Sequence, residues 1–147
     1  NHMIGSFLFY LHIVATSMMI GVIWVIQLVH YPSFHFVDRS RYELFQDFHM
    51  RNISRIVFPV MFIELITGVF LVQSPIFGNS NSFFYIAFIL LIIIWFLTAT
   101  LFISIHKNLS NGYNKNIIYR LVNLNWLRTI LWSLRMVFIF GSISDSL

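Results

Sequence analysis

The side chains best suited to chemistry in this sequence are histidines that lie within or beside long apolar runs. His12 and His30 are eighteen residues apart, which is five turns of an α-helix, so they share one face at a separation of about 27 Å. Gln27 falls on the same face. His49 and His106 lie near the ends of other apolar runs. Imidazole ligates haem iron as well as zinc, iron and copper, so this pattern predicts a cofactor or metal site.

A second candidate pair is Glu64 and Arg135, each deep inside an apolar run. A lone charge inside a membrane costs a few kcal/mol or more, so we expect the two side chains to pair. The pair could hold two helices in register or form part of a site. Arg128 and Trp132 share a helix face with Arg135 and give it a polar and aromatic character.

The composition indicates where these residues must lie. Of the 147 residues, 59% are apolar and only 10% are charged, against about 25% charged in a soluble domain. These values exclude a soluble globular enzyme and a disordered chain. The absence of cysteine excludes disulfides, thiolate nucleophiles and iron–sulfur clusters. The basic residues form no stripe, so we expect the lipid bilayer and not nucleic acid as the partner.

The predicted fold is all-α: an integral membrane four-helix bundle that forms a single transmembrane domain over residues 1–147. A bilayer core about 30 Å thick needs roughly 20 apolar residues in a helix. Four runs meet this requirement, and they cover about 4–29, 56–72, 83–105 and 124–140.

Loop charges predict the orientation, because Lys and Arg are enriched in cytoplasmic loops. The first and third connections are basic, whereas the second connection and both ends of the chain contain no Lys or Arg. We therefore expect a multi-pass protein of the bacterial inner membrane with both termini on the outer, periplasmic side. The basic connections contain Arg39, Arg41, Arg51, Arg55, Lys107, Lys115 and Arg120.

The first and third connections also carry local structural signals. Tyr31-Pro32 is predicted to end the first span, because proline disfavours helix in the residue before it. Ser40 and Glu43 form a capping-box pattern. They predict a short amphipathic helix that lies at the interface between spans one and two, or runs straight into span two. The segment 108–116 is predicted to be a polar hinge.

The first functional expectation is a haem- or porphyrin-binding membrane protein with a redox role, whose enzymatic form would be a membrane oxidoreductase. A helix bundle with inward histidines is a familiar haem scaffold. His30 with His106, or His49 in place of one of them, could ligate haem b near the cytoplasmic face. The haem would be noncovalent and would exchange electrons with a quinone or oxygen. Arg55 and Arg128 could pair with the propionates.

Two other functions fit the same residues. His30, His49 and His106 could form a non-haem site for Zn, Fe or Cu. Alternatively, Glu64 and Arg135 could form the mid-membrane site of a small-molecule carrier, which would need a homodimer to build a pathway. The structural alternatives are that the helix-end histidines anchor the interface and that His12 hydrogen-bonds to a neighbouring helix.

One resemblance bears on His12. The sequence Leu11-His12-Ile13 with Gly21 and Trp24, followed by Arg55-Ile56, Pro59, Met61 and Thr67-Gly68, resembles the small membrane-bound protoporphyrinogen IX oxidases of the J type. That resemblance implies that His12 binds haem or a porphyrin. Gln27 stands where that family tends to carry arginine.

A closer resemblance is to an uncharacterised family of four-span bacterial inner-membrane proteins. It rests on Gln27-Leu28-Val29-His30-Tyr31-Pro32, Phe48-His49, Pro59, Glu64-Leu65, His106, Asn125-Trp126-Leu127-Arg128-Thr129, Trp132 and Arg135. This resemblance implies a four-span membrane fold and supplies no activity.

Overall fold

The computed structural model describes residues 2–74 and 82–144. Across these ranges the chain is helical and contains no strand, which confirms the all-α prediction. Four stretches are long and apolar enough to cross a membrane, as expected of a multi-pass membrane protein. They cover Met3–Phe36, Arg39–Val72, Ser82–Leu109 and Lys115–Ile143.

The first span is longer than the sequence predicts, and Tyr31-Pro32 does not end it. Helix α1 (His2–Val25) passes into a π-helical segment, η1 (Ile26–His30), then into α2 (Tyr31–Ser33) and a 3₁₀ turn, η2 (Phe34–Phe36). Proline is tolerated in the first turn of a helix, where Pro32 lies. The Tyr31 N–H bonds to the Ile26 carbonyl, so the wider π turn carries the chain past the proline.

The second span also begins earlier than predicted. Helix α3 runs without interruption over Tyr42–Val72, so the amphipathic segment is the start of span two and not a separate interfacial helix. The first turns of the helix are held by a buried face of their own: Tyr42, Gln46 and His49 are spaced by four and three residues and are buried, as Met61 and Glu64 are further along the helix.

The turn before α3 is capped by a residue other than the predicted one. The Asp38 carboxylate accepts hydrogen bonds from the Ser40 backbone N–H at 2.8 Å and from the Ser40 hydroxyl at 2.7 Å. These bonds lower the pKa of Asp38 below its ordinary value. Asp38 therefore caps the 3₁₀ turn η3 (Arg39–Arg41), and Ser40 serves as a donor to Asp38 in place of its predicted role as the cap.

The third span, like the first, contains a π-helical segment. Helix α4 (Ser82–Leu97) passes through a second π-helical segment, η5 (Thr98–Phe102), into α5 (Ile103–Leu109). The predicted polar hinge contains a turn in which Gly112 has a φ of 124°, a conformation that favours glycine. Helix α6 (Lys115–Ser144) follows and begins before the predicted start of span four.

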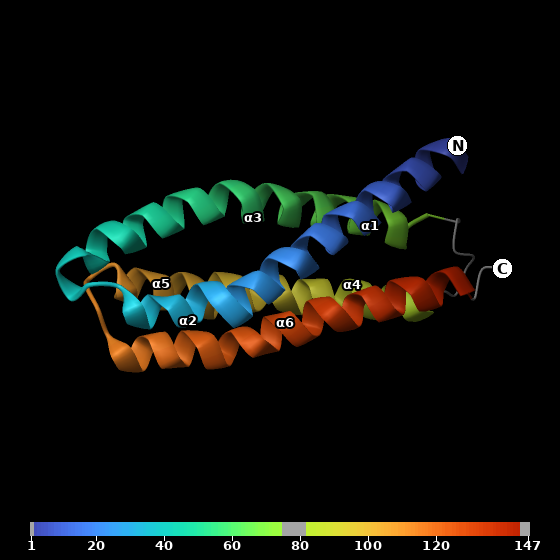
Figure 1. Cartoon of the computed structure of the whole chain (residues 1–147). Helices are drawn as coiled ribbons and strands as arrows, with labels where there is room; N and C mark the ends of the chain where they lie inside the picture. The colour runs from blue at the N-terminus through green and yellow to red at the C-terminus, as the bar shows by residue number, and fades with distance from the viewer. Residues whose placement is uncertain (1, 75–81, 145–147) are drawn as a thin grey trace.

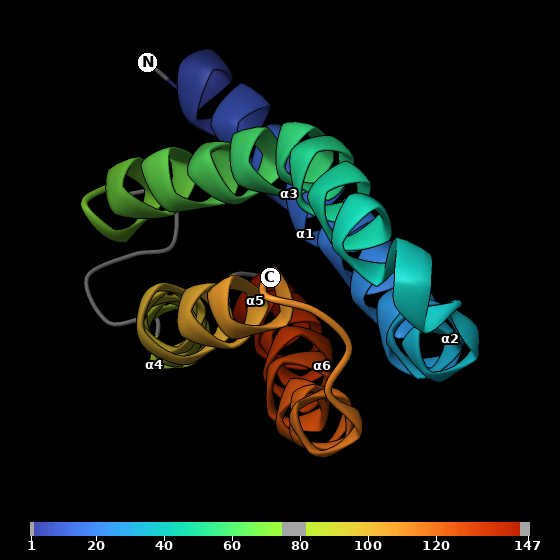
Figure 2. The same cartoon turned by 90° about the vertical axis from the view of Figure 1, so that its left-hand side faces the viewer.

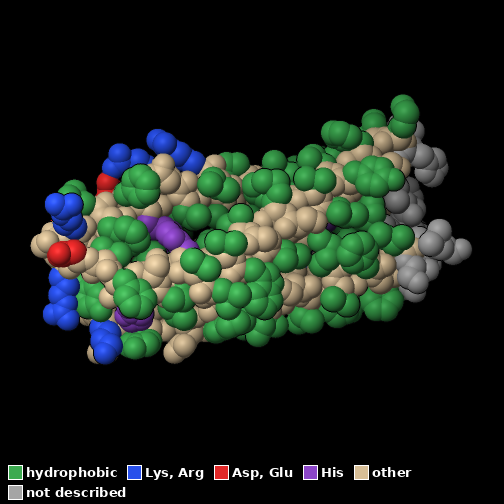
Figure 3. All heavy atoms as spheres, viewed as in Figure 1, with side chains coloured by type: hydrophobic (Ala, Val, Ile, Leu, Met, Phe, Trp, Pro, Cys, Tyr) green, Lys and Arg blue, Asp and Glu red, His purple; other side chains and the backbone are tan. Residues whose placement is uncertain are grey.

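The helices form two antiparallel pairs (Figures 1 and 2). Helix α1 packs on α3, and α4 packs on α6, with further contacts between α1 and α6. Helix α1 begins and α6 ends at the same end of the bundle (Figure 1). The Lys and Arg side chains visible in Figure 3 gather at the opposite end. We call this the basic end and define it by Arg39, Arg41, Lys107 and Lys115.

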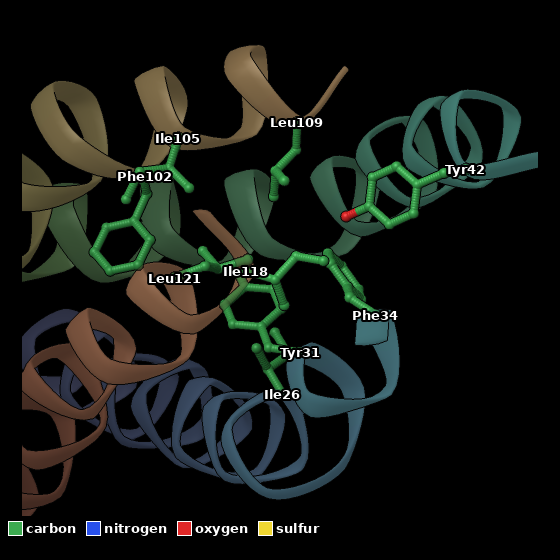
Figure 4. Close-up of a cluster of buried hydrophobic side chains, with 9 residues drawn as sticks. All are labelled: Ile26, Tyr31, Phe34, Tyr42, Phe102, Ile105, Leu109, Ile118 and Leu121. Carbon is green, nitrogen blue, oxygen red and sulfur yellow. The ribbon is translucent and has the colours of Figure 1, made fainter. Parts of the chain in front are cut away.

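The interior holds two apolar clusters. One lies toward the basic end and joins Tyr31, Phe34, Tyr42 and Phe102 with aliphatic residues of α5 and α6 (Figure 4). The other lies along α1, α3, α4 and α6 and consists of Met19, Ile23, Met61, Ile94 and Trp132. The face in view in Figure 3 is also largely apolar, and large hydrophobic side chains are exposed along all four spans, as a bilayer requires. The polar side chains buried in the bundle therefore stand out as candidates for a site.

Candidate functional site

The buried polar residues form two networks, of which the first surrounds Glu64 and Arg135. Arg135 Nη1 lies 2.9 Å from Glu64 Oε1, and both side chains are 0% exposed. Arg135 also donates to the Ala87 carbonyl at 3.0 Å and to the Thr16 hydroxyl at 3.1 Å. Glu64 accepts from Thr16 at 2.8 Å and from Trp132 at 3.2 Å. The charges of the pair thus cancel inside a complete hydrogen-bonded shell.

His12 belongs to this network through both of its ring nitrogens. Thr67 donates its hydroxyl hydrogen to the Ile63 carbonyl at 2.6 Å. His12 Nδ1 must then be the donor in its 2.7 Å contact with Thr67 Oγ1. The other nitrogen, Nε2, accepts from Arg135 Nη2 at 3.1 Å. Because neither nitrogen is free, this arrangement gives His12 a hydrogen-bonding role between helices and leaves it no lone pair for haem iron.

The second network lies nearer the basic end and begins at Gln27. The Gln27 amide donates to the Val122 carbonyl at 3.1 Å and accepts from Asn125 at 2.8 Å. The Asn125 oxygen in turn accepts from Arg128 Nε at 3.1 Å and from Arg128 Nη2 at 2.7 Å. Gln27 and Asn125 therefore fix the orientation of the Arg128 guanidinium.

Arg128 is a buried cation whose described partners are all neutral. It is 5% exposed, donates to Tyr31 Oη at 3.3 Å and to Thr98 Oγ1 at 3.4 Å, and lies 3.6 Å above the centre of the Phe102 ring. Within residues 2–74 and 82–144, the ion pairs are Arg51–Asp47 and Arg135–Glu64, so Arg128 has no carboxylate partner there. Burying an unpaired charge is costly, so this position calls for an anion.

Three histidines predicted from sequence as metal ligands come together beside Arg128. His30 Nε2 lies 2.7 Å from His49 Nδ1, and the rings of His49 and His106 are 5.3 Å apart between centroids. In the described part of the chain, however, no three His, Asp or Glu side chains are arranged to hold a metal ion. His35 lies apart from this cluster and packs on the Tyr119 ring at 4.4 Å.

The hydrogen bonds of His106 leave the hydroxyl hydrogen of Tyr31 available for a further hydrogen bond. The Gln46 amide nitrogen donates to His106 Nδ1 at 3.0 Å, which places the ring hydrogen on Nε2. His106 Nε2 then donates to Tyr31 Oη at 3.0 Å, and Arg128 donates to the same oxygen. Tyr31 Oη thus accepts twice, and its own hydrogen is available to a further acceptor.

This second network is less complete than the first. Five buried polar atoms of the described side chains have no hydrogen-bond partner, and two of them, Gln46 Oε1 and His49 Nε2, belong to this network; the others are His35 Nε2, Tyr42 Oη and Trp95 Nε1. Buried polar atoms are nearly always hydrogen-bonded, so unpartnered ones mark a place where a further group can bind. Gln46 and His49 do not line the Arg128 cavity, so their free hydrogen-bonding capacity lies in the histidine cluster beside it.

A cavity of about 60 Å³ lies against the donors of this network. Its polar lining residues are Tyr31, Ser54, Thr98, His106 and Arg128, and its remaining walls are mostly apolar. Both π-helical segments border it, η1 through Ile26 and η5 through Thr98 and Phe102. Such segments occur frequently at functional sites. The cavity can accept a small oxygen-bearing group, with the Tyr31 hydroxyl and the Arg128 guanidinium as donors.

Two predicted residues remain, of which Trp132 contacts both networks and Arg55 contacts neither. Trp132 lines the cavity and also donates to Glu64, so it links the Arg128 network to the Glu64–Arg135 network. Arg55 is exposed on α3 and does not face the cavity. Sequence reasoning did not assign Gln46 or Thr98 to a site and used Tyr31 only as a helix stop. The available signal for Gln46 was its position three residues before His49, on the same helix face.

The chain matches no family model, no curated protein and no solved structure.

Proposed function

We propose that this protein binds, inside the membrane, an apolar molecule that carries an anionic oxygen group, with Arg128 and Tyr31 as the donors to that group. The observation that carries this proposal is the unpaired buried charge of Arg128 at the wall of an apolar cavity. An arginine in such a place is stabilised by a carboxylate. Four of its five N–H groups donate to Asn125, Tyr31 and Thr98, so one N–H remains to donate to the carboxylate.

The surroundings of Arg128 support an oxygen anion in particular. Phe102 below the guanidinium and the Asn125 oxygen beside it hold the cation in place, which reduces the entropy lost on binding. The Tyr31 hydroxyl supplies a neutral donor on the same wall. Apolar residues such as Met19 and Ile23 line the other side, so the rest of the ligand is expected to be apolar.

Two classes of molecule share this chemistry. A porphyrin with carboxylate side chains is the ligand expected from the sequence, and haem b is its iron form, which would supply one-electron chemistry when bound. A long-chain fatty acid carries the same carboxylate on a linear body. In either case Arg128 would hold the carboxylate. Axial ligation through His106 would require one of its two hydrogen bonds to open, whereas His49 Nε2 has no partner among the described side chains.

The test uses the purified protein in detergent and measures binding of protoporphyrin IX and of cis-parinaric acid, a fluorescent fatty acid. We expect Arg128→Gln to weaken binding by about tenfold or more, as is usual when a buried charged hydrogen-bonding partner is lost. The matched control is Arg55→Gln, which removes an exposed arginine and should bind as the wild type does.

A second comparison requires no substitution. The methyl ester of the fatty acid has the same body without the negative charge, so it should bind the wild-type protein more weakly than the acid. Equal binding of ester and acid, or unchanged binding by Arg128→Gln, would refute the proposal. The relative affinities of the porphyrin and the fatty acid decide which class the site prefers.

We further propose that the protein lies in a bacterial inner membrane with its basic end in the cytoplasm and both termini outside. The support is the positive-inside rule, applied to the Lys and Arg residues gathered at one end of the bundle (Figure 3). In this orientation the Arg128 cavity lies in the cytoplasmic half of the membrane.

A further inference from the structure

A second hollow lies on the outer surface between α1 and α3. It is an apolar groove of about 410 Å³ whose walls include Gly21, Val25 and Val29 on one helix and Ile56 on the other. Its size falls within the range of roughly 300–1,000 Å³ that is usual for ligand pockets. The inner cavity, at about 60 Å³, has room for a head group and not for the body of an apolar ligand.

The groove and the cavity are neighbours. Ile26 of η1 and Ile53 of α3 line both of them, so these two side chains separate the outer hollow from the inner one. Ile26 belongs to the π-helical segment that replaces the regular α-helix at this point. A ligand that lay in the groove would have the Arg128 wall on the other side of this apolar pair.

The side chains of Ile26 and Ile53 take no part in the hydrogen bonds between the two helices. These bonds join His12 to Thr67 at 2.7 Å, Thr16 to Glu64 at 2.8 Å and, toward the basic end, His30 to His49 at 2.7 Å. Because Ile26 and Ile53 have apolar side chains, a change of their rotamers breaks no hydrogen bond.

The groove is elongated along the helix axis. Its wall on the first helix extends from Gly21 to His30, which at 1.5 Å per residue is about 14 Å. On α3 the wall consists of Ile53 and Ile56, so the groove follows the axis of the first helix. This shape suits a linear hydrocarbon chain, which lies parallel to transmembrane helices in a bilayer. A planar macrocycle would need a wider opening.

We infer that this groove binds the hydrocarbon chain of the ligand, that the ligand enters sideways from the bilayer, and that its carboxylate passes between Ile26 and Ile53 to Arg128. This inference rests on the proposed function and makes it more specific, because it selects a long-chain carboxylic acid as the ligand class. The chain then lies toward mid-membrane and the head group toward the basic end.

Gly21 provides the test, because a Cβ atom added there meets nothing within 4 Å. Gly21→Phe should therefore fold and fill the groove with its ring. The control is Val137→Phe, which adds a ring on α6 at a position that is 65% exposed. Val25→Phe, from the same wall of the groove, is a second groove-filling variant should Gly21→Phe fail to fold.

The measurement is titration calorimetry with palmitic acid and with octanoic acid, which have the same head group and different chain lengths. We expect Gly21→Phe to weaken palmitic acid binding by about tenfold or more and to leave octanoic acid unchanged, while Val137→Phe changes neither. Wild-type affinity of Gly21→Phe for palmitic acid, or equal losses for both acids, would overturn the groove assignment alone. If neither acid binds the wild-type protein, the proposed function fails as well.

Discussion

Arg135 Nη2 donates a hydrogen bond to His12 Nε2 across 3.1 Å. A buried guanidinium thus occupies the lone pair of the nitrogen that would ligate an iron atom. Together with the bond from His12 Nδ1 to Thr67, this makes His12 a bridge between α1, α3 and α6. The residue with the strongest family resemblance to a porphyrin ligand therefore has an interhelical role in this structure.

This arrangement makes a prediction for haem. His106 is hydrogen-bonded at both nitrogens, as His12 is. Haem added to the purified protein should therefore give a dithionite-reduced spectrum without the sharp α band of bis-histidine ligation. The opposite result, a sharp band that is lost in His30→Ala or His106→Ala, would show that the histidine cluster opens and ligates the iron.

The Glu64–Arg135 pair is predicted to be structural. Breaking a buried pair on one side leaves a charge without a partner and costs about 3–5 kcal/mol. Arg135→Met and Glu64→Met should each lower the unfolding free energy in mixed micelles by about that amount. The double variant Glu64→Met/Arg135→Met removes both charges, so it should be more stable than Arg135→Met alone. Additive losses would contradict this account.

Exchange of the two residues is a sharper test of the same network. Arg135 also bonds to the Ala87 carbonyl and to Thr16, and an arginine at position 64 would begin on a different helix. The exchanged protein should therefore recover only part of the lost stability. Full recovery would mean that the charge pair alone matters and that the surrounding bonds contribute little.

The Tyr31 hydroxyl should contribute to ligand affinity. Tyr31→Phe removes the donor that lines the cavity and leaves the ring in the apolar cluster; it also removes the acceptor of the hydrogen bonds from His106 and Arg128. Loss of one hydrogen bond should weaken binding of the carboxylic acid by about threefold to tenfold. Tyr119→Phe, at an exposed tyrosine on α6, is the matched control. An unchanged affinity of Tyr31→Phe for the acid would show that Tyr31 does not donate to the ligand, and Arg128 would remain as the proposed donor.

Gly68 is predicted to be intolerant of a side chain, in contrast to Gly21. A Cβ atom at Gly68 would lie 3.0 Å from the Phe88 ring and 3.3 Å from His12 Cε1. Gly68→Val should therefore displace both rings and cost about 1–3 kcal/mol through overpacking. Thermal unfolding in detergent measures this cost, and a Gly68→Val protein as stable as Gly21→Val would disprove the close packing.

The proposed orientation is open to a direct test because the chain contains no cysteine. Asn111→Cys places a single thiol in the turn at the basic end, and Ser82→Cys places one at the start of α4, at the other end; both positions are exposed. A membrane-impermeant maleimide applied to intact cells should label Ser82→Cys and spare Asn111→Cys. The reverse labelling pattern would show that the protein has the opposite orientation in the membrane.

The helix lengths show how far sequence reasoning extended and where it stopped. The apolar runs alone identified the four spans, because a bilayer core of fixed thickness demands a minimum length of apolar helix. Their ends were less predictable. Pro32 is absorbed by a π-helical turn, and Gln46 and His49 extend α3 because they face buried partners of other helices. Such ends depend on tertiary contacts that a local pattern does not contain.

The sequence by itself determined the all-α membrane class, the four spans and the need for Glu64 and Arg135 to have partners, because each follows from the cost of placing polar groups in hydrocarbon. Only the tertiary structure decided which of the buried charged residues have a partner of opposite charge and which do not. The relative rotation of the helices gives Arg135 an acid and leaves Arg128 with neutral partners. That rotation is fixed by side-chain packing among all the helices, and no single helix encodes it.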